Sequence, residues 1–293
     1  MVNVSYVYPN TCELPQRGGL VDRWRLAVAA GCGCVEVPAD FVKGVSEERK
    51  TGLSVCSFLS PDAIAALYER DADVPEELEY CLHTEPSLPR EDQYGLVHQA
   101  ALMWHNKDWV KQFAAMTLDI GRFLGKPPRY VEIHPGDQRN TFKDLLFAVH
   151  ALLDGHAEVF GKKPVVLVEN RTNQFISKGS DIASFWQFIV DEEPSLRGQV
   201  GVVLDVSQFF TVTRAGFEAQ LGMIPLDAVK GLHVHFKHAA PSLSDVVPWM
   251  KVFDTIKRLN GEVLVNPEVS HRKNVAPTIA FCKKHFSTQK TVK

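Results

Sequence analysis

Long apolar segments are absent from this 293-residue sequence. No run approaches the roughly 20 apolar residues that a helix needs to cross a bilayer. The first ten residues, MVNVSYVYPN, also lack the basic segment and apolar core of a secretory signal peptide. We therefore expect no membrane-spanning helix and a cytoplasmic location.

Cysteine is sparse and shows no framework-like spacing. A chain of this length does not need disulfide bonds to stabilise a small core. Cys32-Gly33-Cys34 offers only two thiols, too few for a structural zinc site, and a strand-like segment follows it. We expect buried, reduced thiols. The six cysteines are Cys12, Cys32, Cys34, Cys56, Cys81 and Cys282.

A strong excess of basic residues is also missing, because the formal net charge is -3. This balance argues against a protein that binds polyanions without specificity, although a local basic rim remains compatible with it. The C-terminal KKHFSTQKTVK is basic. We interpret it as a solvated tail.

Short β-rich runs alternate with longer amphipathic runs along the whole chain. This alternation is typical of a (β/α)8 TIM barrel, and a doubly wound open sheet is the runner-up. The segment after the first strand, YPNTCELPQRGG, lacks the G-x-G-x-x-G pattern that favours the open sheet. We expect one barrel domain over 1–293, with a lid-like insertion around 84–109. The expected strands are 4–8, 33–37, 80–84, 129–134, 164–169, 200–205, 231–236 and 262–268, and the clearest helical patterns are 20–31, 108–125, 142–161, 181–193 and 247–261.

Histidines and carboxylates stand at or near the carboxyl ends of six consecutive strands. In a TIM barrel the carboxyl ends of the strands form the active-site face, so these side chains should meet there. They offer nitrogen and oxygen but no sulfur, which suits zinc, or alternatively manganese, as one or two ions. The residues are His83, His134, Glu169, Asp205, His235 and Glu268.

Each of these residues also has a structural interpretation. A histidine at the end of a buried strand can simply be a hydrogen-bonded core residue. The carboxylates of Glu169, Asp205 and Glu268 are harder to explain in that way, because a buried carboxylate needs a cation or several donors. On the strand at 231–236, alternation places His233 on the same face as His235 but one layer deeper. Glu132 stands in the same relation to His134, as a candidate partner of the ligands.

Several motifs resemble the xylose isomerase-like barrel superfamily and, within it, endonuclease IV, the zinc-dependent apurinic/apyrimidinic endonuclease. The segment IHPGD is similar to that family's His-Pro-Gly strand end, which implies that His134 is a metal ligand. The segment LVENRTNQ resembles its Leu-Glu-Asn segment and implies that Glu169 bridges two ions. The segment VGVVLDVSQ resembles Val-Gly-x-x-x-Asp-x-x-His and implies a ligand role for Asp205.

The resemblance continues to the last strand. The segment HVHFKH is similar to the His-Leu-Asn-Asp of the nucleases and to the His-Leu-Lys-Asp of the sugar isomerases, and both alignments imply His235 as a ligand. The segment NPEV supplies Glu268, and CLHTEP places His83 at the nucleases' first-metal histidine. Gln208 stands where the nucleases have the histidine of Asp-x-x-His, and His238 replaces the aspartate of His-x-x-Asp. No Asp-x-His pair follows the strand at 231–236, so the family's third metal site is missing.

Three functions remain open from the sequence. The first is a hydrolase of small phosphoesters or abasic DNA, with two ions bridged by Glu169 and an attacking water oriented by Glu268. The second is a single-metal sugar or keto-acid isomerase or epimerase in which Glu169 and Glu268 move a proton. The third is a metal- or ligand-binding barrel without turnover. We favour the hydrolase, because the isomerases do not need a histidine at position 134.

Substrate-binding residues are expected close after the strand ends. Arg139, Arg171 and Lys237 are candidates for holding a phosphate, the arginines in a bidentate manner. Gln208 and His238, the two departures from the family motifs, are candidates as well. The insertion contains WHNKDW at 104–109. We interpret it as a packed lid, with a wedge that enters bent DNA as the alternative.

Overall fold

The computed structural model describes residues 2–10, 19–39, 41–47, 54–68, 74–84 and 101–287. Its centre is a closed barrel of parallel strands in the order β1-β10-β9-β8-β7-β6-β5-β2. Every strand predicted from the sequence is present, and its first residue lies within two positions of the predicted first residue. The barrel strands are β1 (Asn3–Tyr8), β2 (Cys34–Pro38), β5 (Glu79–His83), β6 (Tyr130–Ile133), β7 (Val165–Glu169), β8 (Val200–Asp205), β9 (Val229–His233) and β10 (Glu262–Asn266).

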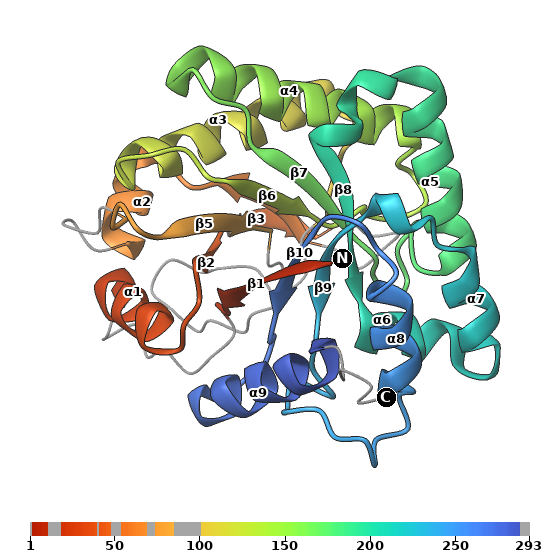
Figure 1. The fold of residues 1–293 in the computed structure, drawn as a ribbon. Coiled ribbons are helices and arrows are strands. Elements are labelled where there is room, and N and C mark those ends of the chain that lie inside the picture. The colour runs from red at the N-terminus through yellow and green to blue at the C-terminus, as the bar shows by residue number, and fades with distance from the viewer. Residues whose placement is uncertain are drawn as a thin grey trace.

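Helices surround the barrel (Figure 1). Side-chain caps mark the ends of several of them. Thr141 and Asp144 form a reciprocal capping box at the start of α4, and Gly161 ends that helix with a φ of 66°. The helices are α1 (Gly19–Ala29), α2 (Pro61–Leu67), α3 (Lys107–Phe123), α4 (Phe142–Phe160), α5 (Gly179–Glu192), α6 (Val206–Thr213), α7 (Phe217–Met223), α8 (Trp249–Ile256) and α9 (Val275–Phe286).

Short 3-10 turns complete the connections at η1 (Pro194–Gly198), η2 (Arg214–Gly216), η3 (Leu226–Ala228) and η4 (Arg272–Asn274). None of the helices in the described ranges is long and apolar enough to cross a membrane. The closed parallel barrel confirms the (β/α)8 fold and excludes the doubly wound open sheet.

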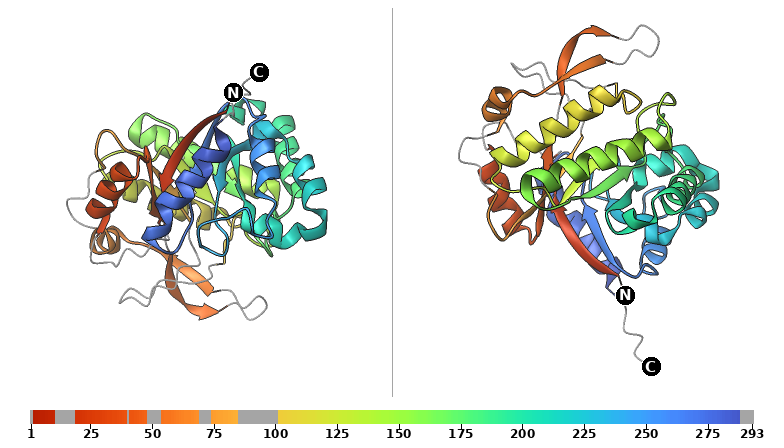
Figure 2. Two further views of the ribbon diagram at one scale, coloured as in Figure 1. Left: turned by 60° about the horizontal axis from the view of Figure 1, so that its bottom comes forward. Right: turned by 90° about the horizontal axis from the view of Figure 1, so that it is seen from above.

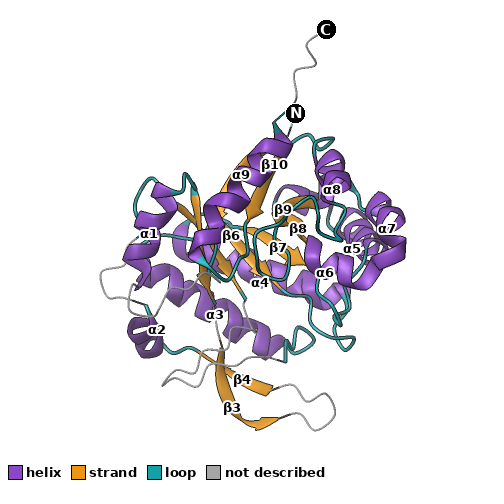
Figure 3. Cartoon of the chain, turned by 90° about the horizontal axis from the view of Figure 1, so that it is seen from below, coloured by secondary structure: helices purple, strands orange, loops and turns teal. Residues whose placement is uncertain are grey.

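An antiparallel hairpin was not predicted. It consists of β3 (Phe41–Glu47) and β4 (Ser54–Phe58), and its pairing shifts register between Lys43 and Glu47. The hairpin projects from the barrel beside α3 (Figures 2 and 3). Because it directly follows β2, it leaves the barrel at the carboxyl end of the strands.

The barrel interior has an apolar lower layer and a polar upper layer. Successive side chains of a strand point to opposite faces, so residues two apart share the interior. Cys81 therefore lies below His83, Leu167 below Glu169, and Val203 below Asp205. The lower layer is one buried cluster of Val7, Cys34, Cys81, Tyr130, Leu167, Val203 and Leu264, while a larger cluster fills the space between the strands and the helices. Cys32, Cys34, Cys81 and Cys282 are buried free thiols, as expected.

Candidate metal centre

One group of ligand atoms converges at the ends of β5, β6 and β7. The Nε2 atoms of His83 and His134 lie 3.0 Å apart. The Oε2 atom of Glu169 lies 3.1 Å from the first and 2.7 Å from the second. All three side chains are fully buried. Separations near 3 Å between three donor atoms are those of ligands around one small ion, so this trio forms a candidate metal site.

A second group lies at the ends of β8, β9 and β10. The Nε2 atom of His235 is 3.5 Å from Oδ1 of Asp205 and 3.3 Å from Oε2 of Glu268. The Nδ1 atom of His233 lies 3.3 Å from the same oxygen of Glu268. Asp205, His233 and Glu268 can present one ligand atom each within a common site. The structure thus brings all six predicted metal ligands to one end of the barrel, in two neighbouring groups.

The hydrogen bonds of the two histidines on this side differ. The backbone amide of His238 donates to Nδ1 of His235 at 3.1 Å, which leaves the ring proton on Nε2. By contrast, Nε2 of His233 lies 3.0 Å from Oε1 of Glu132 and its Nδ1 lies 3.3 Å from Oε2 of Glu268, so both of its ring nitrogens face carboxylates. His233, which was predicted to lie one layer deeper, therefore stands beside His235 as a second candidate nitrogen ligand of this group. His235 must move its proton to Nδ1 before it can bind an ion through Nε2.

Glu36 was not predicted as part of the site. Its Oε1 lies 2.6 Å from Nδ1 of His83 and accepts a hydrogen bond from Nδ2 of Asn266 at 3.0 Å. The backbone amide of Asn10 also donates to its carboxylate. Arg23 in turn donates to Oδ1 of Asn10 and to the backbone oxygen of Glu36. The sequence did contain a signal for Glu36. It stands two residues after Cys34 on β2, just as His83 stands two residues after Cys81 on β5.

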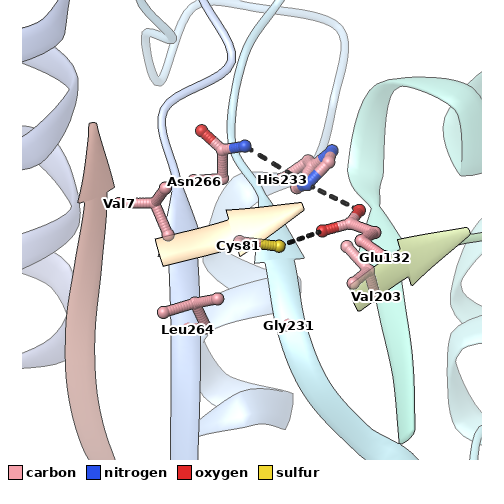
Figure 4. A pocket seen from close by; sticks show the side chains of 8 residues that line it. All are labelled: Val7, Cys81, Glu132, Val203, Gly231, His233, Leu264 and Asn266. Carbon is pink, nitrogen blue, oxygen red and sulfur yellow. Dashed lines mark hydrogen bonds and ion pairs between the residues drawn. The ribbon is translucent and has the colours of Figure 1, made fainter. Parts of the chain in front are cut away.

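A further pair crosses the barrel just below the two groups (Figure 4). Glu132 from β6 contacts His233 from β9, and its other oxygen faces the thiol of Cys81 at 3.8 Å. Asn266 approaches the same histidine at 3.5 Å. Glu132 was predicted as a partner for His134. The structure places its carboxylate against His233 and, at 3.7 Å, against His83.

Burial and charge pull the pKa values of these groups in opposite directions. Burial lowers the pKa of His134 to about 4 despite the Glu169 carboxylate, so its ring is neutral at pH 7. Burial also acts to lower the pKa of His83, but the carboxylates of Glu132, Glu169 and Glu36 outweigh it and hold that pKa well above its ordinary value. Burial likewise acts to raise the pKa of Glu169, yet His134 and Arg171 hold it well below its ordinary range.

The site concentrates negative charge in the barrel. Five carboxylates are almost completely buried: Glu36, Glu132, Glu169, Asp205 and Glu268. Two guanidinium groups lie close, Arg23 beside Glu36 and Arg171 at 3.4 Å from Oε1 of Glu169. With every histidine ring neutral, as metal binding requires, three negative charges remain, and a buried charge without compensation costs several kcal/mol. One bound divalent ion would leave the site with a net negative charge, and two would leave it with a net charge of one positive unit.

Several buried ligand atoms also make no hydrogen bond within the described residues. Hydrogen-bonding groups in a protein interior are nearly always paired, so a set of such atoms facing one another indicates a missing partner. A divalent ion would satisfy them. These atoms are Oε1 of Glu132, Oδ2 of Asp205, Nδ1 of His233 and Oε2 of Glu268.

Three of the five predicted substrate-binding residues lie at the site. Arg171 reaches Glu169. Gln208 donates its backbone amide to Oδ1 of Asp205 at 3.0 Å, and its side chain accepts from the amide of Thr172. The ring of His238 stacks on that of His235, with 4.6 Å between centroids.

The other two candidates are engaged elsewhere. Arg139 forms an ion pair of 2.7 Å with its neighbour Asp137. The ammonium group of Lys237 lies 5.5 Å from the centre of the Phe236 ring, in a turn where Lys237 and His238 both have positive φ. Neither of these contacts involves a residue of the two ligand groups.

The described part of the expected insertion packs against the barrel. Residues 85–100 lie outside the described residues. Trp104 is fully buried and donates its Nε1 to the backbone oxygen of His134 at 2.9 Å. Trp109 and Phe113 continue the same aromatic cluster, with centroid distances of 5.0 and 5.3 Å to Trp104. These indoles support the end of β6 and are not presented to solvent as a wedge.

Comparison with known proteins identifies the fold. No protein-family model and no curated protein sequence matches the chain. Solved structures do match. The D-psicose 3-epimerase of Clostridium cellulolyticum H10 has a TM-score of 0.54 and 12% identity, over 97% of this chain and 99% of that one. The AP endonuclease, family 2, of Brucella melitensis has a TM-score of 0.54 and 15% identity, over 96% and 98%.

A third match is the IolI protein with a bound zinc atom, with a TM-score of 0.58 and 13% identity, over 98% of this chain and 100% of that one. The chain therefore has the xylose isomerase-like TIM-barrel fold, as the sequence resemblance implied. Because sugar epimerases and a nuclease share this fold, the fold alone does not choose between hydrolase and isomerase.

Proposed function

We propose that the protein is a divalent-metal-dependent phosphoester hydrolase that holds two ions, with zinc first and manganese as the alternative. The observation that carries this proposal is the convergence of His83, His134 and Glu169 on one point. A single-metal isomerase has no need of such a trio. The charge balance agrees, because two divalent ions turn a cluster of excess negative charge into a site with one positive charge, which favours an anionic substrate.

Each side chain then has a defined task. His83 and His134 would hold the first ion together with Glu169, whose Oε1 faces Arg171 and, at 4.0 Å, Nδ1 of His233. Asp205, Glu268 and either His235 or His233 would hold the second. When bound, two adjacent ions lower the pKa of a water and stabilise the leaving oxygen of a phosphoester.

Two residues act on the substrate and the water. Glu268, which would hold the second ion, also stands where it would orient the attacking water. Arg171 is 14% exposed in its side chain, and from that position it contacts a phosphate oxygen. The substrate class is a small phosphoester or abasic DNA. The AP endonuclease fold match is compatible with either one.

A sugar or keto-acid isomerase with one ion is the second candidate. Glu169 at the end of β7 and Glu268 just after β10 approach the site from different sides of the barrel, as two proton-transferring carboxylates must. Several structures of the same fold are named as sugar epimerases. In this case His83 and His134 would contact the substrate. A barrel that binds metal without turnover remains a third outcome, motivated by Gln208 and His238.

Metal stoichiometry separates these candidates. The protein would be purified without chelator or affinity-tag metal, and bound metals per chain counted by mass spectrometry. We expect about two equivalents for the native chain and about one for His134→Ala. His150→Ala, on the exposed side of α4, is the matched control and should keep both. An equal count in the native chain and His134→Ala would exclude the two-ion site.

Activity assays complete the test. The native protein would be assayed on bis(p-nitrophenyl) phosphate, an abasic oligonucleotide and a panel of ketoses and aldoses. Glu169→Gln should abolish turnover in either case. Phosphoester cleavage supports the hydrolase, sugar interconversion supports the isomerase, and inactivity after metal is added back supports the binding protein.

A further inference from the structure

A second cavity lies at the opposite end of the barrel from the metal centre. It has a volume of about 470 Å³, which is within the range of small-molecule sites. Its walls include Tyr130, Val165 and Val229, the first residues of β6, β7 and β9. The metal ligands instead stand at the last residues of the strands or just beyond. In TIM barrels this amino-terminal face usually contributes to stability only, so a cavity with charged walls needs an explanation.

The acidic groups of this cavity already have partners. Glu262 forms an ion pair of 2.6 Å with Arg129, and Asp227 forms one of 2.6 Å with Arg197. The remaining charged lining residues are Lys230 and Arg258. Within the described residues, neither lies within ion-pair distance of a carboxylate. The cavity therefore presents two positive charges that form no ion pair within the described residues.

Lys230 is positioned by its surroundings. Its side chain lies across Gly201 of β8, where an added Cβ would come within 2.6 Å of Cγ and Cδ of the lysine. The ammonium group donates to the backbone oxygen of Arg197 at 2.6 Å. Burial lowers the pKa of Lys230 to about 8, with the Asp227 carboxylate opposing the shift. A half-buried ammonium group whose bonded partner is a neutral carbonyl is a favourable place for an anion.

We propose that this cavity binds a small organic molecule that carries a dianionic phosphate monoester or phosphonate group. Lys230 and Arg258 contact the anionic oxygens, and their two charges match a dianion better than a monoanion. Tyr130, Val165, Leu226 and Val229 contact the apolar body of the ligand. This site does not depend on the proposed function, because it shares no residue with the metal centre.

Phenylphosphonate is a suitable probe because its carbon–phosphorus bond resists hydrolysis at the metal centre. Binding to the metal-loaded protein would be measured by calorimetry at pH 7.5, and its position by chemical-shift changes of the Val165 and Val229 methyl groups. Benzenesulfonate, which has a similar shape and a single charge, is the matched ligand control. We expect saturable millimolar or tighter binding of phenylphosphonate and at least tenfold weaker binding of benzenesulfonate.

Variants locate the site. Lys230→Met and Arg258→Met should each weaken binding of phenylphosphonate at least tenfold, while Lys143→Met, on exposed α4, should leave it unchanged. His134→Ala should also leave it unchanged, since that residue lies at the other end of the barrel. Absence of saturable binding would overturn the proposal. Binding that survives Lys230→Met and Arg258→Met but disappears in His134→Ala would also overturn it, by assigning the anion to the metal centre.

Discussion

The orientation of His83 depends on one buried carboxylate. Glu36 accepts a hydrogen bond from Nδ1, which holds one ring proton there and directs Nε2 at His134 and Glu169. Asn266 and the amide of Asn10 hold Glu36 itself in place. Carboxylates behind metal-binding histidines fix the ring and increase its basicity. Glu36 is therefore a positioning residue for the first ion of the proposed pair.

Glu36→Gln should weaken binding of that ion by about 10- to 100-fold, as loss of such a partner does in other metal sites. The measurement is metal affinity by competition with a chromophoric chelator. Nitrogen NMR of the metal-free protein should also show a lower pKa for the His83 ring, because the Glu36 carboxylate is one of the groups that raise it. Glu79→Gln, at the other end of β5, is the control and should bind metal normally. Unchanged affinity and an unchanged His83 pKa in Glu36→Gln would show that His83 is held by other contacts.

Most of the site could be predicted from single residues in the sequence. A histidine or carboxylate at the end of an apolar run stands out, and this pattern identified His83, His134, Glu169 and Asp205. Glu36 was missed because a strand near the N-terminus was interpreted only for its thiols. The orientation of His233 could not be predicted either, because it depends on Glu132, which is 101 positions away in the chain and meets it only after the barrel closes.

At the scale of elements, the contact between α5 and α7 depends on one glycine. Gly179 is the first residue of α5, and a Cβ built on it would lie 1.8 Å from the backbone oxygen of Gln220 in α7. A backbone atom cannot turn aside as a side chain can, so the helices must separate. This close approach follows from packing, and no local pattern in the sequence indicates it.

Gly179→Ala should therefore lower the free energy of unfolding by about 1–3 kcal/mol, the range for overpacked sites. Chemical denaturation monitored by circular dichroism measures this change. Gly222→Ala in α7 is the matched control, because its Cβ would meet nothing within 4 Å. That substitution should be neutral or stabilising by about 0.5–1 kcal/mol, since alanine favours a helix. Equal effects of the two substitutions would contradict this account of the contact.

The barrel strands were predictable, while the hairpin of β3 and β4 was not. The barrel strands are buried on both faces and read as nearly continuous apolar runs, such as VVLVE in β7. The hairpin sequence FVKGVSE contains a glycine and charges instead, and the element projects from the barrel (Figure 3). An element outside the core leaves little periodic signal in the sequence.

For the molecule as a whole, the proposed ions should contribute to stability. They would bind the folded barrel, where five buried carboxylates are brought together, and not the unfolded chain. At a free metal concentration of 100 times Kd, each bound ion adds about 2.7 kcal/mol to the free energy of unfolding. We expect a chelator to lower Tm by several degrees and added zinc to restore it. If the chelator removes the metal but Tm does not change, this prediction is contradicted.

Stability should also depend on pH through a histidine outside the metal centre. His156 on α4 is fully buried, and burial lowers its pKa to about 4. Its Nε2 lies 3.2 Å from the hydroxyl of Thr117 on α3. An unfolded chain takes up a proton on this histidine near pH 6.5, whereas the folded chain does so only near pH 4. The folded state therefore keeps its full stability above pH 6.5 and loses stability as the pH falls toward 4.

Between neutral pH and about pH 5 this loss amounts to roughly 2 kcal/mol. Urea denaturation at both pH values, with chelator present throughout so that metal release does not contribute, measures it. His156→Leu removes the titrating ring, so its loss between the two pH values should be smaller by that amount. His150→Gln, on the same helix but exposed, should behave like the native chain. If His156→Leu shows the same pH dependence as the native chain, other groups must cause the acid sensitivity, and the five carboxylates of the barrel interior become the next candidates.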